Sequence, residues 1–282
     1  MKYYHLYSNH LSKALLFRSR EDFEFFINRL ALLVRGRKVK VYAYCLMSNH
    51  IHLLVSGEES DILALFRDLR RTYAQYLGYR YEGNVSLDDF TPELREVTSP
   101  EDFRTTVAYI LRNPQAAGVE SVFAYEWSSA FLYFNPRLSS LTVKTPQEYG
   151  KVHFREQMHT RVNDTEGILM LGDYISPAIW CDYKTVERFF GRSLDYMKYL
   201  SNWNAERDYD CLEGNEHNAH PDSYIVEQVE SFCNSHGCSH PAALEVVTRR
   251  QLIRLLHRKF GASVKQIQRQ TGEDEQTIRR FI

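Results

Sequence analysis

The sequence predicts an α+β protein with an antiparallel sheet, helices on one face of that sheet, and an all-α C-terminal domain. Over the first third of the chain, strand-like and helix-like patterns follow one another in the order βαββαβα. Helices segregated to one side of an antiparallel sheet form a layered α+β domain. Near the end of the chain the patterns are helical only. We therefore expect a first domain at residues 1–135, a mostly helical connector at 136–221 and a helical domain at 222–282.

Each element of the first domain follows from its periodicity and its turn residues. The predicted strands are residues 3–7, 39–46, 50–55 and 90–97, and the predicted helices are residues 20–34, about 61–77, and 100–113. The last helix is expected to end near Asn113, because Pro114 disfavours helical geometry in the residue before it. A kink at Pro114, or a short extension closed by Gly118, is the alternative. The polar stretch 204–223 is typical of a linker.

A pair of histidines begins the third predicted strand. His50 and His52 are two residues apart in HIHLLV, so their imidazoles should project from the same face of the sheet. Two imidazoles on one face can grip a metal ion. A His-x-His pair in a strand is more often surface or hydrogen-bonded polar structure, so the pair needs support from elsewhere in the chain.

The helix at 100–113 offers that support. Its residues Thr105, Tyr109 and Asn113 recur every four positions, away from the apolar stripe of Phe103 and Ile110. A phenol and an amide oxygen one turn apart could serve as a nucleophile and a third metal ligand, if that face approaches the histidines. The chain has 19 tyrosines, most of which must be packing or surface residues.

Three segments together resemble a known family. YAYCLMSNHIHLLV, VAYILRNPQAAGV and YEWSSAFLYF, in this order within residues 1–135, are similar to the single-tyrosine HUH transposases, particularly the REP-associated group. The resemblance implies a ferredoxin-like catalytic domain in which His50 and His52 bind Mg²⁺ or Mn²⁺. It implies Tyr109 as the nucleophile and Asn113 at the ligand position one turn beyond. Imidazole ligands alone would suit Zn²⁺ equally well.

The chain departs from this family at two places. Gln115 and Ala116 replace an apolar and a basic residue of the family's usual NPVRAGL, which predicts a weaker phosphate contact. The stretch at 79–90 lacks the basic, glycine-containing pattern that the family has there, so local DNA contacts are also expected to differ.

The last two predicted helices, SVKQIQRQTG and DEQTIRRFI, form a helix-turn-helix arrangement around Gly272. Residues 248–282 hold nine Lys and Arg against three Asp and Glu. This region is similar to the DNA-binding domain of bacterial replication initiators of the DnaA type. The final helix would carry these residues toward DNA: Gln276, Thr277, Arg279 and Arg280. A three-helix bundle with a solvated basic face explains the same pattern.

Other cationic and aromatic residues are candidates for nucleic-acid contact. The candidates are Arg67, Arg70 and Arg71 on the second helix, and Arg35, Arg37, Lys38 and Lys40 near the end of the first. Solvated charged faces are an equal alternative. Tyr42 and Tyr44 should share one strand face, where they would stack on bases or, more commonly, pack under a helix.

Composition limits the class of protein that this chain can be. The 282 residues are 44% hydrophobic and carry a net charge of −1, which counts mildly against a nucleic-acid enzyme. We expect a cytoplasmic protein that does not enter a membrane, because the chain has neither a membrane-length apolar run nor a secretion signal. The five scattered cysteines favour reduced thiols. A zinc site at Cys233, His236, Cys238 and His240 is a minor alternative, since a loop between helices explains that cluster as well.

The sequence thus predicts a metal-dependent tyrosine transposase that cuts and rejoins single-stranded or hairpin DNA through a 5′-phosphotyrosine link. The chief rival is a non-catalytic, sequence-specific DNA-binding regulator derived from a transposase. A third interpretation is a metal-dependent phosphodiesterase that uses water. A homodimer is also possible, because the superfamily includes members whose tyrosine comes from a partner subunit.

Overall fold

The computed structural model describes residues 2–8, 15–81, 87–159, 161–162, 164–201 and 222–282. Its centre is a four-stranded antiparallel sheet with the strand order β2-β3-β1-β4. The strands are β1 (Tyr3–Ser8), β2 (Lys40–Met47), β3 (His50–Ser56) and β4 (Pro92–Val97). The order of the two inner strands, β3 beside β1, decides which residues meet in the site described below.

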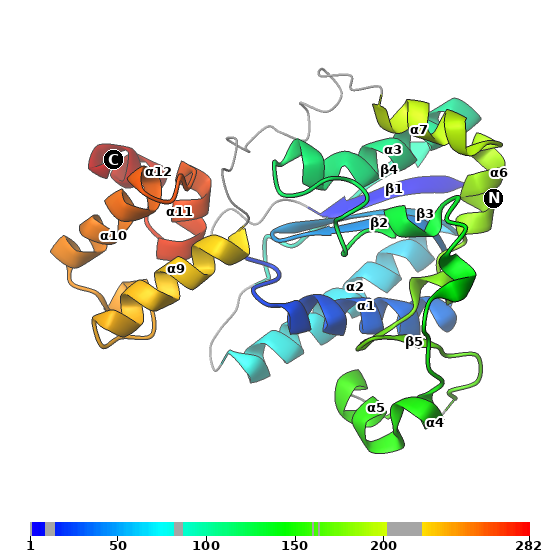
Figure 1. Ribbon diagram of the computed structural model, residues 1–282, viewed down its shortest axis with the longest axis horizontal. Coiled ribbons are helices and arrows are strands. Elements are labelled where there is room, and N and C mark those ends of the chain that lie inside the picture. The colour runs from blue at the N-terminus through cyan, green and yellow to red at the C-terminus, as the bar shows by residue number, and fades with distance from the viewer. Residues whose placement is uncertain (1, 9–14, 82–86, 160, 163, 202–221) are drawn as a thin grey trace.

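Helices cover both faces of the sheet (Figure 1). The elements α1 (Arg20–Arg35) and α2 (Glu59–Arg80) pack together on one face, and α3 (Pro100–Ala116) lies across the other. The prediction of helices on one face is therefore wrong for α3. The reason is that β2 and β3 are apolar on both sides: Leu53 and Leu54, neighbours in β3, are both fully buried.

The helix α3 runs through Pro114 to Ala116, so it has the short extension before Gly118 rather than an end near Asn113. Proline removes the backbone donor that would reach the carbonyl of Ile110. The side chain of Asn113 supplies donors instead, with Nδ2 at 3.1 Å from the carbonyl oxygen of Tyr109 and 3.4 Å from that of Ile110. This local replacement lets the helix continue past the proline.

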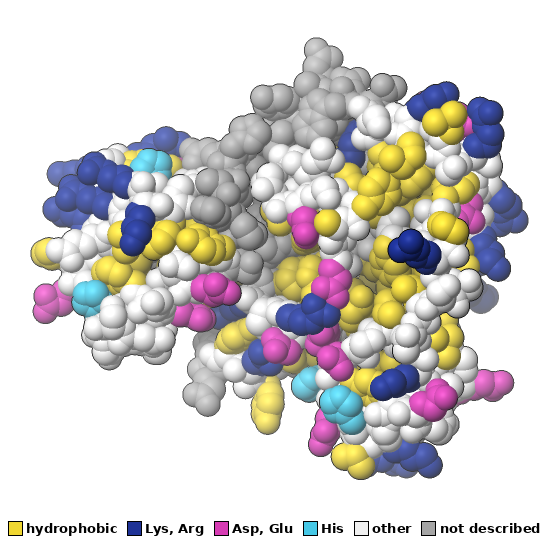
Figure 2. Space-filling view, in the orientation of Figure 1, with side chains coloured by type: hydrophobic (Ala, Val, Ile, Leu, Met, Phe, Trp, Pro, Cys, Tyr) yellow, Lys and Arg dark blue, Asp and Glu magenta, His cyan; other side chains and the backbone are white. Residues whose placement is uncertain are grey.

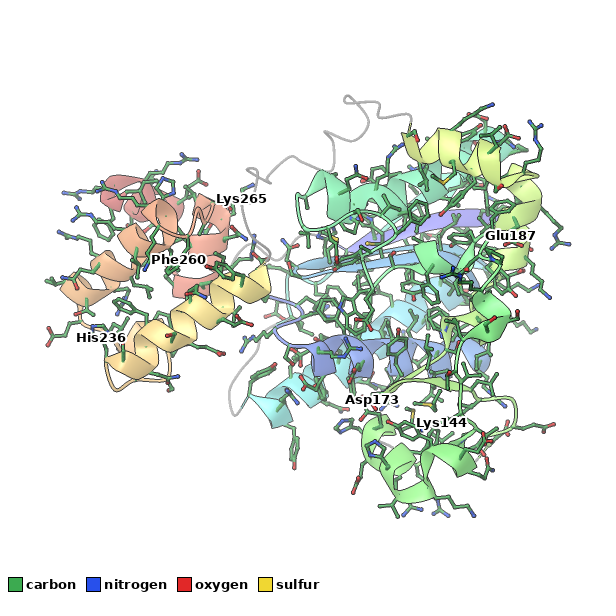
Figure 3. The ribbon with its side chains drawn as sticks, viewed as in Figure 1. Lys144, Asp173, Glu187, His236, Phe260 and Lys265 are labelled. Atoms are coloured by element: carbon green, nitrogen blue, oxygen red, sulfur yellow. The ribbon has the colours of Figure 1, made fainter. Side chains whose placement is uncertain are left out.

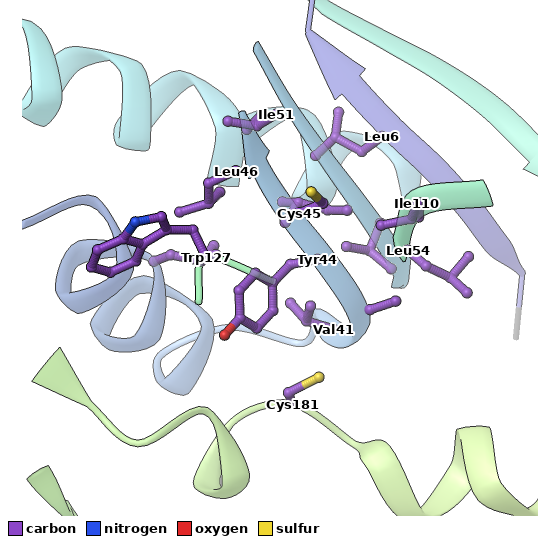
Figure 4. Close-up of a cluster of buried hydrophobic side chains, with 14 of the residues drawn as sticks. Leu6, Val41, Tyr44, Cys45, Leu46, Ile51, Leu54, Ile110, Trp127 and Cys181 are labelled. Atoms are coloured by element: carbon purple, nitrogen blue, oxygen red, sulfur yellow. The ribbon is translucent and has the colours of Figure 1, made fainter. Parts of the chain in front are cut away.

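A β-bulge in β2 separates the two tyrosines that were expected to share a face. The register shifts between Val41 and Ala43. As a result, Tyr42 contacts Phe103 of α3, with ring centroids 5.8 Å apart, whereas Tyr44 lies on the opposite face against Trp180 at 5.2 Å. Figure 4 shows Tyr44 and Ile110 on opposite sides of the hairpin. Both tyrosines are buried, so neither is placed to stack on a base.

The sheet β1–β4 with α1, α2 and α3 is called the first body, and the middle of the chain packs onto it as short elements. They are η1 (Ser129–Leu132), η2 (Leu138–Ser140), α4 (Pro146–Tyr149), α5 (Lys151–Met158), β5 (Met170–Leu171), β6 (Tyr174–Ile175), η3 (Pro177–Ile179), α6 (Tyr183–Phe190) and α7 (Ser193–Ser201). Both α6 and α7 contact α3, and Phe189 stacks on Phe103 with centroids 3.9 Å apart. The predicted linker, residues 204–223, lies almost entirely outside the described residues.

The C-terminal helices have a hydrophobic core of their own. They are α9 (Asp222–Ser235), η4 (Pro241–Ala243), α10 (Val246–Arg258), α11 (Val264–Thr271) and α12 (Glu275–Phe281). Gly272, with φ of 71°, makes the turn between α11 and α12, and Ile267 and Ile278 are both fully buried in the shared core. In the described part of the chain, no helix combines the length and the apolar character needed to cross a membrane.

Candidate active site

The sheet face beneath α3 brings histidines from two strands together. His50 and His52 of β3 are each 2% exposed, and their ring centroids lie 4.8 Å apart. On the neighbouring strand β1, the ring of His5 stacks on that of His52 with centroids 5.1 Å apart. The predicted pair therefore sits in a cluster of three imidazoles under the helix.

Each of the predicted ligands has one ring nitrogen held by the protein. The Nδ1 of His50 lies 2.8 Å from Asn49 Oδ1, and the Nδ1 of His52 lies 3.0 Å from His5 Nε2. A partner on one ring nitrogen fixes the orientation of the imidazole and designates the other nitrogen as the ligating atom. Both histidines would therefore bind an ion through Nε2.

His5 is a functional candidate that sequence reasoning missed. Burial, and then the nearby Arg95 guanidinium, lower the pKa of His5 to about 3, so this imidazole is neutral near pH 7. The available signal was the alternation Tyr3, His5, Tyr7 in β1, which places His5 on the same sheet face as Tyr3. Nothing in the sequence, however, fixes the pairing of β1 with β3.

Tyr109 of α3 faces this cluster. Its half-buried ring lies 5.6 Å from the His52 ring and 5.4 Å from the His5 ring, edge-on to both. Asn113 is buried one helical turn further on. Because its Nδ2 points to the helix backbone, Oδ1 is the atom of Asn113 that could contact a ligand.

A pocket of about 370 Å³ opens beside Tyr109. It is lined by His5, Tyr7, Arg95, Asp102, Thr105, Thr106 and Tyr109. The guanidinium of Arg95 donates to both Asp102 oxygens at 3.0 Å and to Thr106 Oγ1 at 2.7 Å. The pocket thus places an arginine that is paired with an aspartate, and two threonine hydroxyl groups, next to the phenol. The guanidinium and the hydroxyl groups are donors for a phosphate group, whereas the carboxylate is not.

The donor set suits a divalent ion that keeps open positions. Two imidazole nitrogens and an amide oxygen would supply three ligands, fewer than Mg²⁺ or Mn²⁺ usually takes, so water or substrate oxygens would complete the shell. Among the described residues, no group of three or more His, Cys, Asp and Glu is arranged to hold a metal. An ion here would therefore depend on the amide of Asn113 as well as on the imidazoles.

The cluster at Cys233 to His240 has structural roles. His236 Nδ1 lies 2.8 Å from the carbonyl oxygen of Phe232, and its ring stacks on Phe232 at the end of these helices far from the sheet (Figure 3). His240 Nδ1 accepts a hydrogen bond from the backbone N–H of Ala242. Burial raises the pKa of the Cys233 thiol to about 11, which disfavours a thiolate ligand.

The helix α2, which carries the three predicted arginines, lies across the sheet from α3, which carries Tyr109 (Figure 1). Arg67 is exposed, Arg70 lies 3.5 Å from Asp88, and Arg71 lies 3.2 Å from Asp68. DNA held by these side chains would lie on the other side of the molecule from the phenol. Their role in DNA binding stays a prediction.

The predicted contacts on α12 are mostly exposed. Gln276, Arg279 and Arg280 point to solvent, and Arg279 pairs with Glu275 at 2.9 Å. Thr277 Oγ1 donates to the Asp274 carboxylate at 2.6 Å, which caps the helix. Figure 2 shows Lys and Arg side chains gathered on these C-terminal helices. The surface is suited to phosphate contact.

Comparisons with known proteins add one structural likeness. No family model matches the chain, and no curated protein matches it. Among solved structures, the chain is similar to the "Structure of the REP associates tyrosine transposase bound to a REP hairpin". The likeness has 17% sequence identity and a TM-score of 0.37, and covers 45% of this chain and 76% of that chain. A likeness of this TM-score assigns neither a fold nor a family.

Proposed function

We propose that this chain is a tyrosine transposase of the HUH type, which cuts and rejoins single-stranded or hairpin DNA with Tyr109 as the nucleophile. The observation that supports the proposal is the position of the Tyr109 ring, 5.6 Å from that of His52 and on the wall of a pocket of about 370 Å³. The first body, with α1 and α2 on one face and the strand order β2-β3-β1-β4, suits the ferredoxin-like domain expected of such an enzyme.

In this proposal His50, His52 and Asn113 hold a divalent ion, Mg²⁺ or Mn²⁺. When bound, the ion would act as a Lewis acid on the scissile phosphate. A tyrosine in water has a pKa of about 10, so its phenolate is scarce at neutral pH, and a nearby cation would favour the phenolate. Asn49 and His5 keep the two imidazoles oriented. Arg95 and Thr105 line the pocket in which the phosphate would lie.

The reaction is a transesterification. The phenol oxygen of Tyr109 forms a bond to phosphorus, and the bond from phosphorus to the 3′ oxygen breaks. The phenolic proton is matched by the proton that the 3′ oxygen gains, so the products are a 5′-phosphotyrosine and a free 3′-hydroxyl. The phosphodiester energy is kept, so a second 3′-hydroxyl can reverse the step without ATP. The products expected are therefore joined strands rather than hydrolysed ends.

The test is covalent adduct formation by the full chain with hairpin-containing single-stranded DNA and Mn²⁺, read on a denaturing gel. We expect an adduct that is lost in Tyr109→Phe and in His50→Ala, because the first removes the nucleophile and the second removes a ligand. Tyr79→Phe is the matched control, since Tyr79 is 86% exposed on α2 and far from the site.

The other outcomes identify the rivals. DNA binding without any adduct would favour a regulator, whose contacts would come from Gln276, Thr277, Arg279 and Arg280 of the C-terminal helices. Cleavage that survives Tyr109→Phe would favour a phosphodiesterase that uses water. A mixture of Tyr109→Phe and His50→Ala chains that regains adduct would show that a homodimer shares its sites between subunits.

A further inference from the structure

The C-terminal helices reach the candidate active site through a buried carboxylate. Asp222, the first residue of α9, is 6% exposed. Its Oδ2 accepts a hydrogen bond of 2.6 Å from the hydroxyl of Ser48. Ser48 and Asn49 form the turn between β2 and β3, directly before His50. A residue of the C-terminal helices thus holds the turn that leads into a candidate metal ligand.

Within the C-terminal helices, Asp222 is fixed to α11. Gln266 Nε2 donates to Oδ1 over 2.9 Å, and Arg269 Nη2 lies 2.8 Å from both oxygens. The side chains of Asp222 and Arg269 are 4% and 3% exposed. A buried ion pair resists separation, because breaking it leaves an uncompensated charge. The carboxylate that meets Ser48 is therefore held rigidly by the first helix of the predicted helix-turn-helix.

The turn is also held from the side of the first body. The carbonyl oxygen of Ser48 accepts backbone hydrogen bonds from Leu16 and Phe17, at 2.8 and 3.0 Å. The next residue, Asn49, places its Oδ1 at 2.8 Å from His50 Nδ1. The position of this turn consequently sets the direction in which the His50 ring presents Nε2.

The first body and the C-terminal helices enclose a hollow next to Arg269, the partner of Asp222. A pocket of about 640 Å³ lies between them, lined by Arg18, Arg80 and Tyr81 of the first body and by Val226, His240 and Arg269 of the C-terminal helices. In this hollow the two parts do not pack against each other directly. Removal of the hydrogen bond from Ser48 to Asp222 should therefore change the position of the Ser48–Asn49 turn.

We infer that Asp222 is a positioning residue for the candidate metal site: acting through Ser48, it fixes the Asn49–His50 turn and so raises the affinity of His50 and His52 for a divalent ion. The role of the ion rests on the proposed function, whereas the orientation of His50 can be measured without an ion. The helices expected to bind DNA would thereby be coupled to the site expected to cut it.

The test uses the full chain with Ser48→Ala, which removes the hydrogen bond and leaves the Asp222–Arg269 pair intact. Mn²⁺ binding is measured by electron paramagnetic resonance without DNA. We expect Ser48→Ala to bind Mn²⁺ about 3- to 10-fold more weakly, less than the loss of a direct partner of a ligand. Ser48→Thr keeps the hydroxyl and should restore wild-type affinity. Ser235→Ala, an exposed position at the end of α9, is the control and should bind normally.

The second measurement is the nuclear magnetic resonance of the His50 ring nitrogens, assigned by their loss in His50→Gln. Ser48→Ala should shift these signals in the metal-free chain, whereas Ser48→Thr and Ser235→Ala should not. Unchanged ring signals in Ser48→Ala, with or without a change in Mn²⁺ affinity, would overturn the inference. A wild-type chain that binds no Mn²⁺ would count against the proposed function, and a ring shift in Ser48→Ala would still uphold the positioning.

Discussion

At the scale of single residues, His52 has its Nδ1 held by His5, and its Nε2 is the atom proposed to bind an ion. Alternate residues of a strand point to the same face, and β1 pairs with β3, so His5 and His52 lie diagonally on one face with their ring nitrogens 3.0 Å apart. The partner of a ligating imidazole fixes its tautomer and contributes to metal affinity. His5 is therefore as much a part of the proposed site as the histidine it orients.

Replacement of this partner should weaken the site without removing a ligand. In His5→Phe, a ring of similar size remains in the core, but the Nδ1 of His52 loses its partner. We expect Mn²⁺ affinity to fall roughly 10-fold, within the range for such partners, and the adduct yield to fall with it. Isothermal titration calorimetry with Mn²⁺ measures the affinity. His153→Phe, at a half-exposed side chain of α5, is the control, and equal affinities in the two variants would refute the role of His5.

Sequence reasoning could name candidate residues for the proposed site but not all of their contacts. The spacing of His50 and His52 and the helical position of Tyr109 are local patterns, and the structure brings these three residues together. His5 lies 47 positions from its partner His52. That contact depends on strand pairing between distant segments, which no local pattern encodes.

At the scale of elements, two local irregularities decide which side chains meet. The bulge in β2 sends Tyr42 toward α3 and Tyr44 to the opposite face. The side chain of Asn113 supplies the donors that Pro114 lacks, so α3 extends to Ala116. The period of two predicted that Tyr42 and Tyr44 share a face, and the usual effect of proline predicted a helix end near Asn113. The bulge in β2 and the side-chain hydrogen bonds of Asn113 changed these outcomes.

The turn between α11 and α12 requires a positive φ at Gly272, whereas Gly78 in α2 has no such requirement. Gly272 has φ of 71° with no atom within 4 Å of an added Cβ, so Gly272→Ala should destabilise the chain by about 1 kcal/mol through backbone strain alone. Gly78 lies in α2, also with open space around it, and Gly78→Ala should stabilise by roughly 0.5–1 kcal/mol. Urea unfolding measures both, and shifts of the same sign would contradict this account.

At the scale of the whole molecule, the basic residues and the candidate active site lie on different parts of the chain. The net charge is only −1, yet residues 248–282 carry nine Lys and Arg against three Asp and Glu. A basic surface therefore lies on the C-terminal helices, whereas the phenol and the imidazoles lie between α3 and the sheet. The contact between Ser48 and Asp222 links the two. Composition predicted the basic end, but the link could not be predicted, because Ser48 and Asp222 lie 174 positions apart.

The role of Tyr109 as the nucleophile is tested most directly by identifying which protein atom becomes bonded to DNA. The full chain is incubated with a labelled single-stranded hairpin and Mn²⁺, digested, and its DNA-linked peptide is sequenced by mass spectrometry. We predict a peptide from α3 with Tyr109 esterified to the 5′ phosphate of the downstream strand, and a free 3′-hydroxyl on the other fragment. Attachment at any other residue, or cut DNA with no protein attached, would contradict it.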